Sequence, residues 1–207
     1  MAKKAVQSSN LIEIPGINLK EMRLTIRGKT PLITNRFSEV SQDKMEHKQT
    51  GEAVGPQPPR DPKAEFRAGL HVIDEANKVY GFPAAGIKGA LVAAGGRMLG
   101  EKMTVLRGVL NVMGDLLPIE GSEPEMRRDW GRRSGVAALL YRPMFRQWQI
   151  KVPVIFNADL LSKGKVLNLF QHAGFSVGIG EWRPASKSGS GTFGQFEVPE
   201  NEVVVFE

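Results

Sequence analysis

The sequence predicts an α+β fold in one domain, and three features support this. Apolar Met22, Leu24 and Ile26 alternate with polar residues, which is the period of a half-buried strand. Residues 84–98 and 162–173 carry apolar side chains at helical spacing. Short apolar runs typical of strands lie between and after these two helices. A chain of 207 residues has the length of one domain, with or without insertions.

Residues 1–18 are polar and are expected to form a loose tail, which leaves residues 19–207 as the domain. Two insertions are expected inside it, at residues 28–61 and 120–147. The first is charged in its middle and rich in proline at its end, so we expect a long loop that is functional or disordered. The second is basic and partly irregular, which favours a projecting arm or hairpin.

Local signals predict the elements between and after the insertions. Asp61 followed by Pro62 predicts an N-cap and a short helix through about Gly69. Strand-like pieces follow at residues 70–73, 78–82, 108–112 and 116–119, the last two separated by a Gly-Asp turn signal.

Residues 134–143 and 147–156 are expected to form two strands, although Pro153 predicts an edge position or a bulge in the second one. Ser162 predicts the N-cap of the second long helix and Gly174 its end. Residues 177–182, a glycine-rich loop and two closing strands complete the chain, with 177–182 expected as a strand. Without its insertions this order is βαββαβ, a modified ferredoxin-like core of the kind that RNA-recognition modules use.

Composition excludes several classes of site. The chain has no cysteine, so it has no disulfide, thiolate nucleophile or Cys-ligated zinc. Its three histidines show no metal-ligand spacing, and we expect no cofactor. No run of about 18 apolar residues and no signal-peptide pattern is present, which predicts an intracellular protein without a membrane partner.

The net charge of +6 favours a polyanionic partner. Residues 121–151 hold seven basic side chains against three acidic ones, whereas residues 196–207 hold four acidic side chains and no base. This asymmetry suits a nucleic-acid groove on one face, and it also suits head-to-tail contact between copies.

The glycine-rich residues 174–196 contain Trp182, Arg183 and Lys187. Glycine lets backbone approach a ligand closely, while an aromatic ring and cations suit the bases and phosphates of a single strand. The alternative is a flexible loop with Trp182 in the core. Asn35 and Arg36 in the first insertion are further phosphate-binding candidates, or else solvated loop residues.

The stretch YGFPAAGIKGALVAA, residues 80–94, opens a helix among small residues with Lys88 in its first turn. A helix N-terminus attracts phosphate, and Lys88 is the wrong charge for the helix dipole, so it is a candidate ligand unless it only faces solvent. This stretch resembles the glycine- and lysine-containing helix of the RAMP superfamily, the backbone subunits of CRISPR effector complexes. Residues 22–31 and 174–198 are similar to two further blocks of these proteins, and uncharacterised phage and prophage proteins share parts of the pattern.

The resemblance carries over to Gly86, Ile87, Lys88 and Gly89 on the helix, and to Gly178, Gly180, Trp182, Arg183 and Lys187 on the loop. Two departures matter. Ala85 and Gly86 stand where the family usually has two serines, and Arg97 is the nearest substitute for the family's arginine after the helix. The complete set of candidate nucleic-acid-binding residues is Asn35, Arg36, Gly86, Lys88, Arg97, Arg127, Arg128, Arg132, Arg133, Arg142, Arg146, Trp182, Arg183 and Lys187.

The resemblance implies a non-enzymatic protein of the bacterial or phage-infected cytoplasm. Such a protein coats single-stranded RNA or DNA without sequence preference, in a head-to-tail homo-oligomeric filament. Residues 125–135 or the first insertion would act as a projecting thumb. One alternative is a ribonuclease of the same superfamily, with His47, Asp43 or Asp61 as the reacting group. Another is a phage structural or assembly protein. The sequence leaves the choice between RNA and DNA open.

Overall fold

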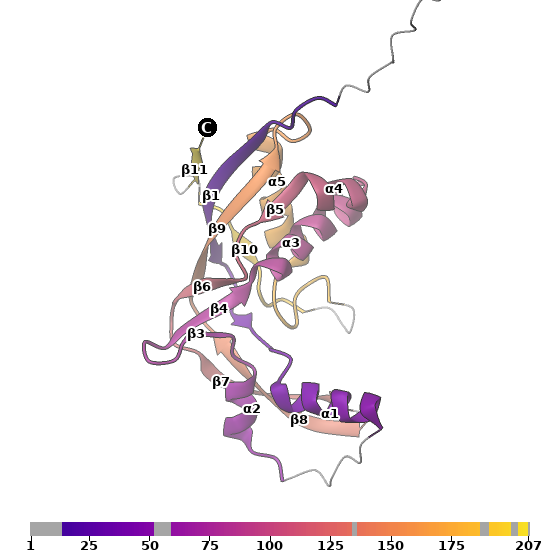
Figure 1. The fold of residues 1–207 in the computed structure, drawn as a ribbon. Coiled ribbons are helices and arrows are strands. Elements are labelled where there is room, and N and C mark those ends of the chain that lie inside the picture. The colour runs from indigo at the N-terminus through magenta and orange to yellow at the C-terminus, as the bar shows by residue number, and fades with distance from the viewer. Residues whose placement is uncertain (1–13, 52–58, 134–135, 187–190, 200–202, 207) are drawn as a thin grey trace, which may run out of the picture.

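The computed structural model describes residues 14–51, 59–133, 136–186, 191–199 and 203–206. This part of the chain is a mixture of helices and antiparallel sheet, which confirms the α+β class. The larger sheet and the helices packed on it form the upper part of the molecule in Figure 1. A three-stranded sheet with two further helices forms the lower part.

Two long antiparallel strands form the centre of the larger sheet. They are β1 (Leu19–Gly28) and β9 (Trp148–Asn157), paired so that Leu24 lies opposite Val152. β10 (Phe196–Glu197) and β11 (Val203–Phe206) pair with the other edge of β1. Beyond β9 lie β5 (Leu110–Val112), β6 (Leu116–Gly121), β4 (Val79–Pro83) and β3 (Val72–Asp74).

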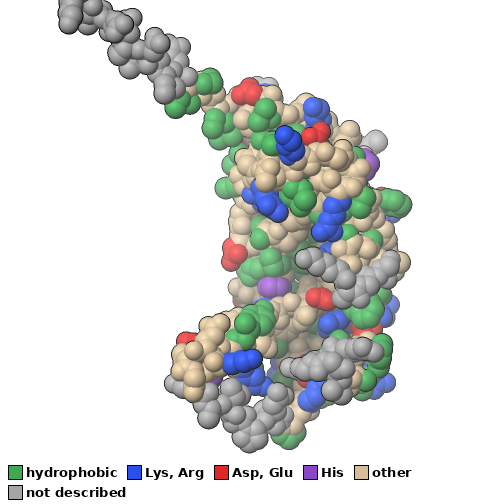
Figure 2. All heavy atoms as spheres, turned by 90° about the vertical axis from the view of Figure 1, so that its right-hand side faces the viewer, with side chains coloured by type: hydrophobic (Ala, Val, Ile, Leu, Met, Phe, Trp, Pro, Cys, Tyr) green, Lys and Arg blue, Asp and Glu red, His purple; other side chains and the backbone are tan. Residues whose placement is uncertain are grey.

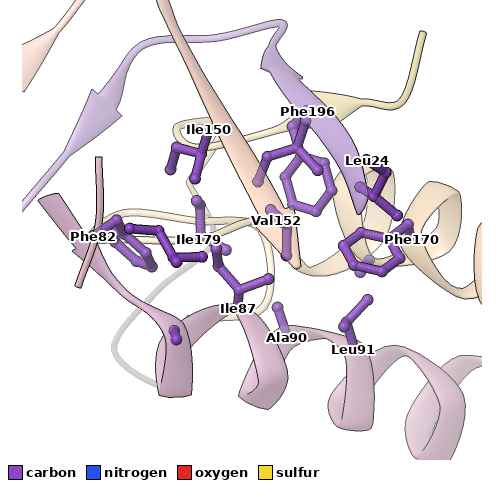
Figure 3. Close-up of a cluster of buried hydrophobic side chains, with 14 of the residues drawn as sticks. Leu24, Phe82, Ile87, Ala90, Leu91, Ile150, Val152, Phe170, Ile179 and Phe196 are labelled. Carbon is purple, nitrogen blue, oxygen red and sulfur yellow. The ribbon is translucent and has the colours of Figure 1, made fainter. Parts of the chain in front are cut away.

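The two predicted long helices, α3 (Ala84–Ala93) and α5 (Lys163–His172), pack on one face of this sheet. Figure 3 shows Ile87 and Leu91 of α3 pointing toward Val152 and Phe170. Every second residue of β9 from Trp148 to Phe156 is buried, as the alternation predicts. None of the described helices has the length and the apolar run needed to cross a bilayer.

The basic insertion forms the hairpin that the sequence predicts. β7 (Glu125–Arg133) and β8 (Val136–Phe145) pair along their length, and β2 (Leu32–Ile33) adds to the base of β8. α2 (Pro62–Ala68) packs against β8, with the Asp61 side chain accepting a hydrogen bond from the Lys63 N–H at 2.8 Å.

The first insertion is not the uninterrupted loop that we predicted. Besides β2 it contains α1 (Glu39–Thr50), which begins at the N-cap Ser38 and ends at Gly51 with a φ of 78°. No residue of α1 is buried, so the apolar stripe by which a helix is normally recognised is absent. The end of this insertion, residues 52–58, lies outside the described residues.

Two further corrections concern β5, β6 and β9. Residues 108 and 109, predicted to begin a strand, end the unpredicted helix α4 (Met103–Val109), so β5 begins only at Leu110. β5 and β6 then lie end to end along β9. Pro153 therefore lies in a central strand, not at an edge. Its carbonyl accepts a hydrogen bond from the Met113 N–H at 2.9 Å, so its missing N–H would face the interruption between β5 and β6.

The glycine-rich loop begins differently from our prediction. α5 does not stop at Gly174 but continues as a π-helical turn, Ala173–Val177, and ends at Gly178 with a φ of 68°. Residues 178–182 are irregular and form no strand. A similar π-helical turn, Ala94–Met98, follows α3 and contacts the first one.

Backbone hydrogen bonds connect the described parts of this loop to one another and to residues 31–33. The Gly194 N–H donates to the Pro31 carbonyl at 2.8 Å, and the Ile179 N–H donates to the Gly194 carbonyl at 3.0 Å. The Glu181 N–H donates to the Ile33 carbonyl at 2.9 Å. The loop is thereby attached to the segment that links β1 and β2.

Gly194→Ala should lower the free energy of unfolding by about 2–4 kcal/mol. Gly194 has a φ of 66°, and an added Cβ would overlap the Ile179 carbonyl oxygen. Gly164→Ala is the matched control, since an added Cβ there meets no atom within 4 Å and lies in α5; it should gain about 0.5–1 kcal/mol. Urea unfolding measures both, and equal stabilities would contradict the structural role assigned to Gly194.

Candidate nucleic-acid interface

A groove of about 440 Å³ runs between α3 and the glycine-rich loop. Its lining includes three stretches that are far apart in the sequence. Asn35 comes from the segment after β2, Gly86 and Arg97 come from α3 and its π-helical turn, and Arg183 comes from the loop. Four of the candidate residues that we predicted from the sequence therefore share one groove.

Glycines shape the α3 side of this groove for two different reasons. An added Cβ at Gly86 would lie 2.8 Å from the Phe82 ring, so Gly86 allows the helix to pack on β4. An added Cβ at Gly89 would meet nothing within 4 Å, so this surface of α3 is bare backbone open to the groove. A ligand can approach such a surface more closely than it can approach a larger side chain.

The two arginines of the groove differ in how firmly they are held. Arg183 donates from Nη1 to the Gly180 carbonyl at 2.7 Å, which ties its guanidinium to the loop backbone. A guanidinium has five N–H donors, so this bond leaves others for a ligand. Arg97 is exposed on the π-helical turn. Both side chains can neutralise an anionic ligand.

His71 also lines the groove, although no spacing in the sequence marks it. Burial of the imidazole lowers the pKa of His71 below its ordinary value of 6.5, and the charge of Arg36 lowers it further, while Asp115 acts in the opposite direction. His71 therefore adds a neutral, polar ring to the wall of the groove at neutral pH.

A second groove of about 390 Å³ lies between the start of α1, α2 and β8. Its lining includes the predicted residues Arg36 and Arg142, together with Tyr141. Asn35 lines both grooves, so they meet at this side chain. Figure 2 shows the side of the molecule that carries α1, α3 and α4, where basic side chains lie on both the upper and the lower part.

Several candidate residues lie away from both grooves. Lys88 donates from Nζ to the Asn111 side chain at 2.5 Å on β5, because its position on α3 turns it toward the sheet edge. Arg127 forms an ion pair with Asp129 at 2.8 Å and lies over the Phe193 ring, 4.7 Å from its centroid. A role for Lys88 or Arg127 in binding stays a prediction.

The remaining candidates belong to the hairpin and the glycine-rich loop. Arg128 is exposed on β7, and Arg146 pairs with Glu125 at 2.9 Å. Trp182 has a φ of 54° and an exposed fraction of 39%, so it is not a core residue. The structure describes only the backbone of Arg132 and Arg133, and Lys187 lies outside the described residues.

The residues considered for catalysis lie apart from the grooves. Asp43 and His47 are on the exposed helix α1, and Asp61 caps α2. Within the described ranges, no group of three or more acidic or histidine side chains is arranged to hold a metal ion.

Comparison with known proteins gives a distant likeness in fold. No family model matches the chain, and no curated protein matches it. Among solved structures, the fold is similar to a chain in a cryo-EM structure of the Type III-B Cmr-beta bound to cognate target RNA. The sequence identity is 14% and the TM-score is 0.49, over 91% of this chain and 61% of that chain. The protein thus spans less than two thirds of its structural neighbour.

The pKa of His71 predicts a pH dependence of stability. In the window just below pH 6.5 the unfolded chain binds more protons than the folded protein, so the free energy of unfolding should rise as the pH rises through it. Protonation on acidification should therefore destabilise the fold. Urea unfolding between about pH 5 and 7 tests this. In the His71→Gln variant the free energy of unfolding should rise less over the same pH range. Identical pH profiles for both proteins would contradict the prediction.

Proposed function

We propose that the protein binds single-stranded nucleic acid along the two grooves, without sequence preference and without catalysis. The observation that carries this proposal is the convergence of Asn35, Arg97 and Arg183 on one groove with a bare glycine surface. Amide and guanidinium donors bind phosphate oxygens whatever the base. The net charge of +6 adds attraction to a polyanion.

The topology supports a modified ferredoxin-like core for this function. The order β10–β1–β9–β6 is antiparallel throughout, and α3 and α5 pack on one face of it. A βαββαβ unit has this arrangement, with β4 and β3 added beyond the core. We propose that the chain is a RAMP-like protein on this ground together with the sequence blocks described above. RNA is the first ligand to test, and DNA of the same length is the comparison.

We further propose that copies of the chain stack head to tail along the strand. The basic hairpin lies in the lower part of the molecule, whereas β11 pairs with β1 at the edge of the upper sheet (Figure 1). Val204 of β11 is 55% exposed and offers part of a surface for the next copy. Light scattering of the protein with and without an oligonucleotide tests this stacking.

Arg97→Gln should weaken binding to single-stranded RNA by about tenfold. The loss should be equal for oligouridine and oligoadenine, since the contact is with phosphate, and the salt dependence should fall by about 0.7 in log–log slope. Fluorescence polarisation with labelled RNA and DNA of about 20 nucleotides across a salt series measures this.

Arg107→Gln is the control for Arg97→Gln, because Arg107 is exposed on α4 and lines neither groove. Equal losses in the two variants would assign the effect to net charge. If the wild-type protein binds neither RNA nor DNA at moderate salt, the proposed function is wrong, and the basic surfaces are then better explained as contacts in a protein assembly.

Trp130→Ala should weaken single-strand binding by about fivefold or more, the size of one lost stacking contact. Trp130 of β7 is 65% exposed and lies opposite Leu139 of β8, which is 44% exposed. Met144 and Phe145, which share the basic segment, are buried and cannot stack on a base. Leu160→Ala, at another exposed apolar position, is the control in the same polarisation assay and should change nothing.

A further inference from the structure

One acidic side chain lies where the two grooves meet. Glu181 lines the first groove, Arg142 lines the second, and Asn35 lines both. The Asn35 side-chain amide donates to Glu181 Oε1 at 3.5 Å, and Arg142 Nη2 lies 3.8 Å from Glu181 Oε2. A strand that passes from one groove into the other must pass these three side chains.

Arg142 is a poorly satisfied cation. Its side chain is 15% exposed, and Glu181 is the acidic partner that the structure gives it among the described residues. The separation of 3.8 Å is an ion-pair distance but exceeds that of a hydrogen bond. Its register partner Arg127 is paired more closely, with both carboxylate oxygens of Asp129 at 2.8 Å from Nε.

The position of Glu181 is set by its backbone. The Glu181 N–H donates to the Ile33 carbonyl, which directs this part of the loop toward the segment that carries Asn35. The carboxylate itself is 38% exposed, and among the described residues it is held by the two long contacts alone. The backbone of Glu181 is thus held in place, but its carboxylate is weakly bound. A ligand that binds Asn35 and Arg142 better can displace this carboxylate.

We propose that Glu181 occupies a phosphate subsite formed by Asn35 and Arg142, and that a phosphate of the bound strand displaces it. This inference rests on the proposed function. A phosphate can accept from a guanidinium through two parallel hydrogen bonds at about 2.7–2.9 Å, which the Glu181 carboxylate does not do here. Displacement joins the two grooves into one continuous path, with Glu181 opposing binding until a strand is present.

A direct test measures the affinity of the full chain for labelled oligouridine of about 20 nucleotides by fluorescence polarisation. Glu181→Gln should tighten binding by about two- to fivefold, because it removes a competing charge worth one partly exposed ion pair. The gain should disappear in the Arg142→Gln background, as a double-mutant cycle requires if both side chains act at one subsite.

Glu125→Gln is the matched control, because it also removes an acidic partner of an arginine, Arg146. Glu125 lies on β7, beside the strand β8 that carries Arg142, and it lines neither groove. An equal gain there, or unchanged or weaker binding by Glu181→Gln, would overturn the inference while leaving the proposed function intact. If the wild-type protein does not bind the oligonucleotide either, the proposed function itself is wrong. Circular dichroism checks folding, and Glu181→Ser serves if the glutamine variant does not fold.

Discussion

The attachment of the glycine-rich loop to the segment after β1 is the constraint on which the site depends. Backbone hydrogen bonds form it, including those from Gly194 to Pro31 and from Glu181 to Ile33, and a bond from Ile179 to Gly194 closes the loop on itself. Such close backbone contact requires glycine, since an added Cβ at Gly180 or Gly194 would overlap a neighbouring carbonyl. The glycines therefore serve packing first, and the groove beside α3 results from that packing.

The interface combines two parts with different physical character. The first groove is built on the sheet and on α3, whose surface is bare at Gly89, and it offers the exposed Arg97 and an Arg183 that is tied to the loop backbone. The second groove is bounded by α1, which has no buried residue, and by the hairpin, whose apolar side chains include the exposed Trp130. A rigid groove suits phosphate neutralisation, and an exposed aromatic ring suits stacking on bases. Asn35 connects the two parts.

Four of the candidates that the sequence predicted line one groove, but the sequence could not rank them. Lys88 had the signal of a phosphate ligand, yet it donates to Asn111, because the position of a side chain around α3 depends on the packing of the helix. His71 and Glu181 had no signal at all. Their surroundings are formed by neighbours such as Arg36 and Arg142, which are far away in the sequence.

The sequence by itself determined the α+β class, the strands β1 and β9, the helices α3 and α5 with the N-cap Ser162, and the basic hairpin. These depend on local periodicity and capping, which neighbouring residues encode. Only the tertiary structure decided that Pro153 is central, that residues 178–182 form no strand, and that the two grooves meet at Asn35. Those features depend on which distant backbone groups pair, and no periodicity in the chain records that pairing.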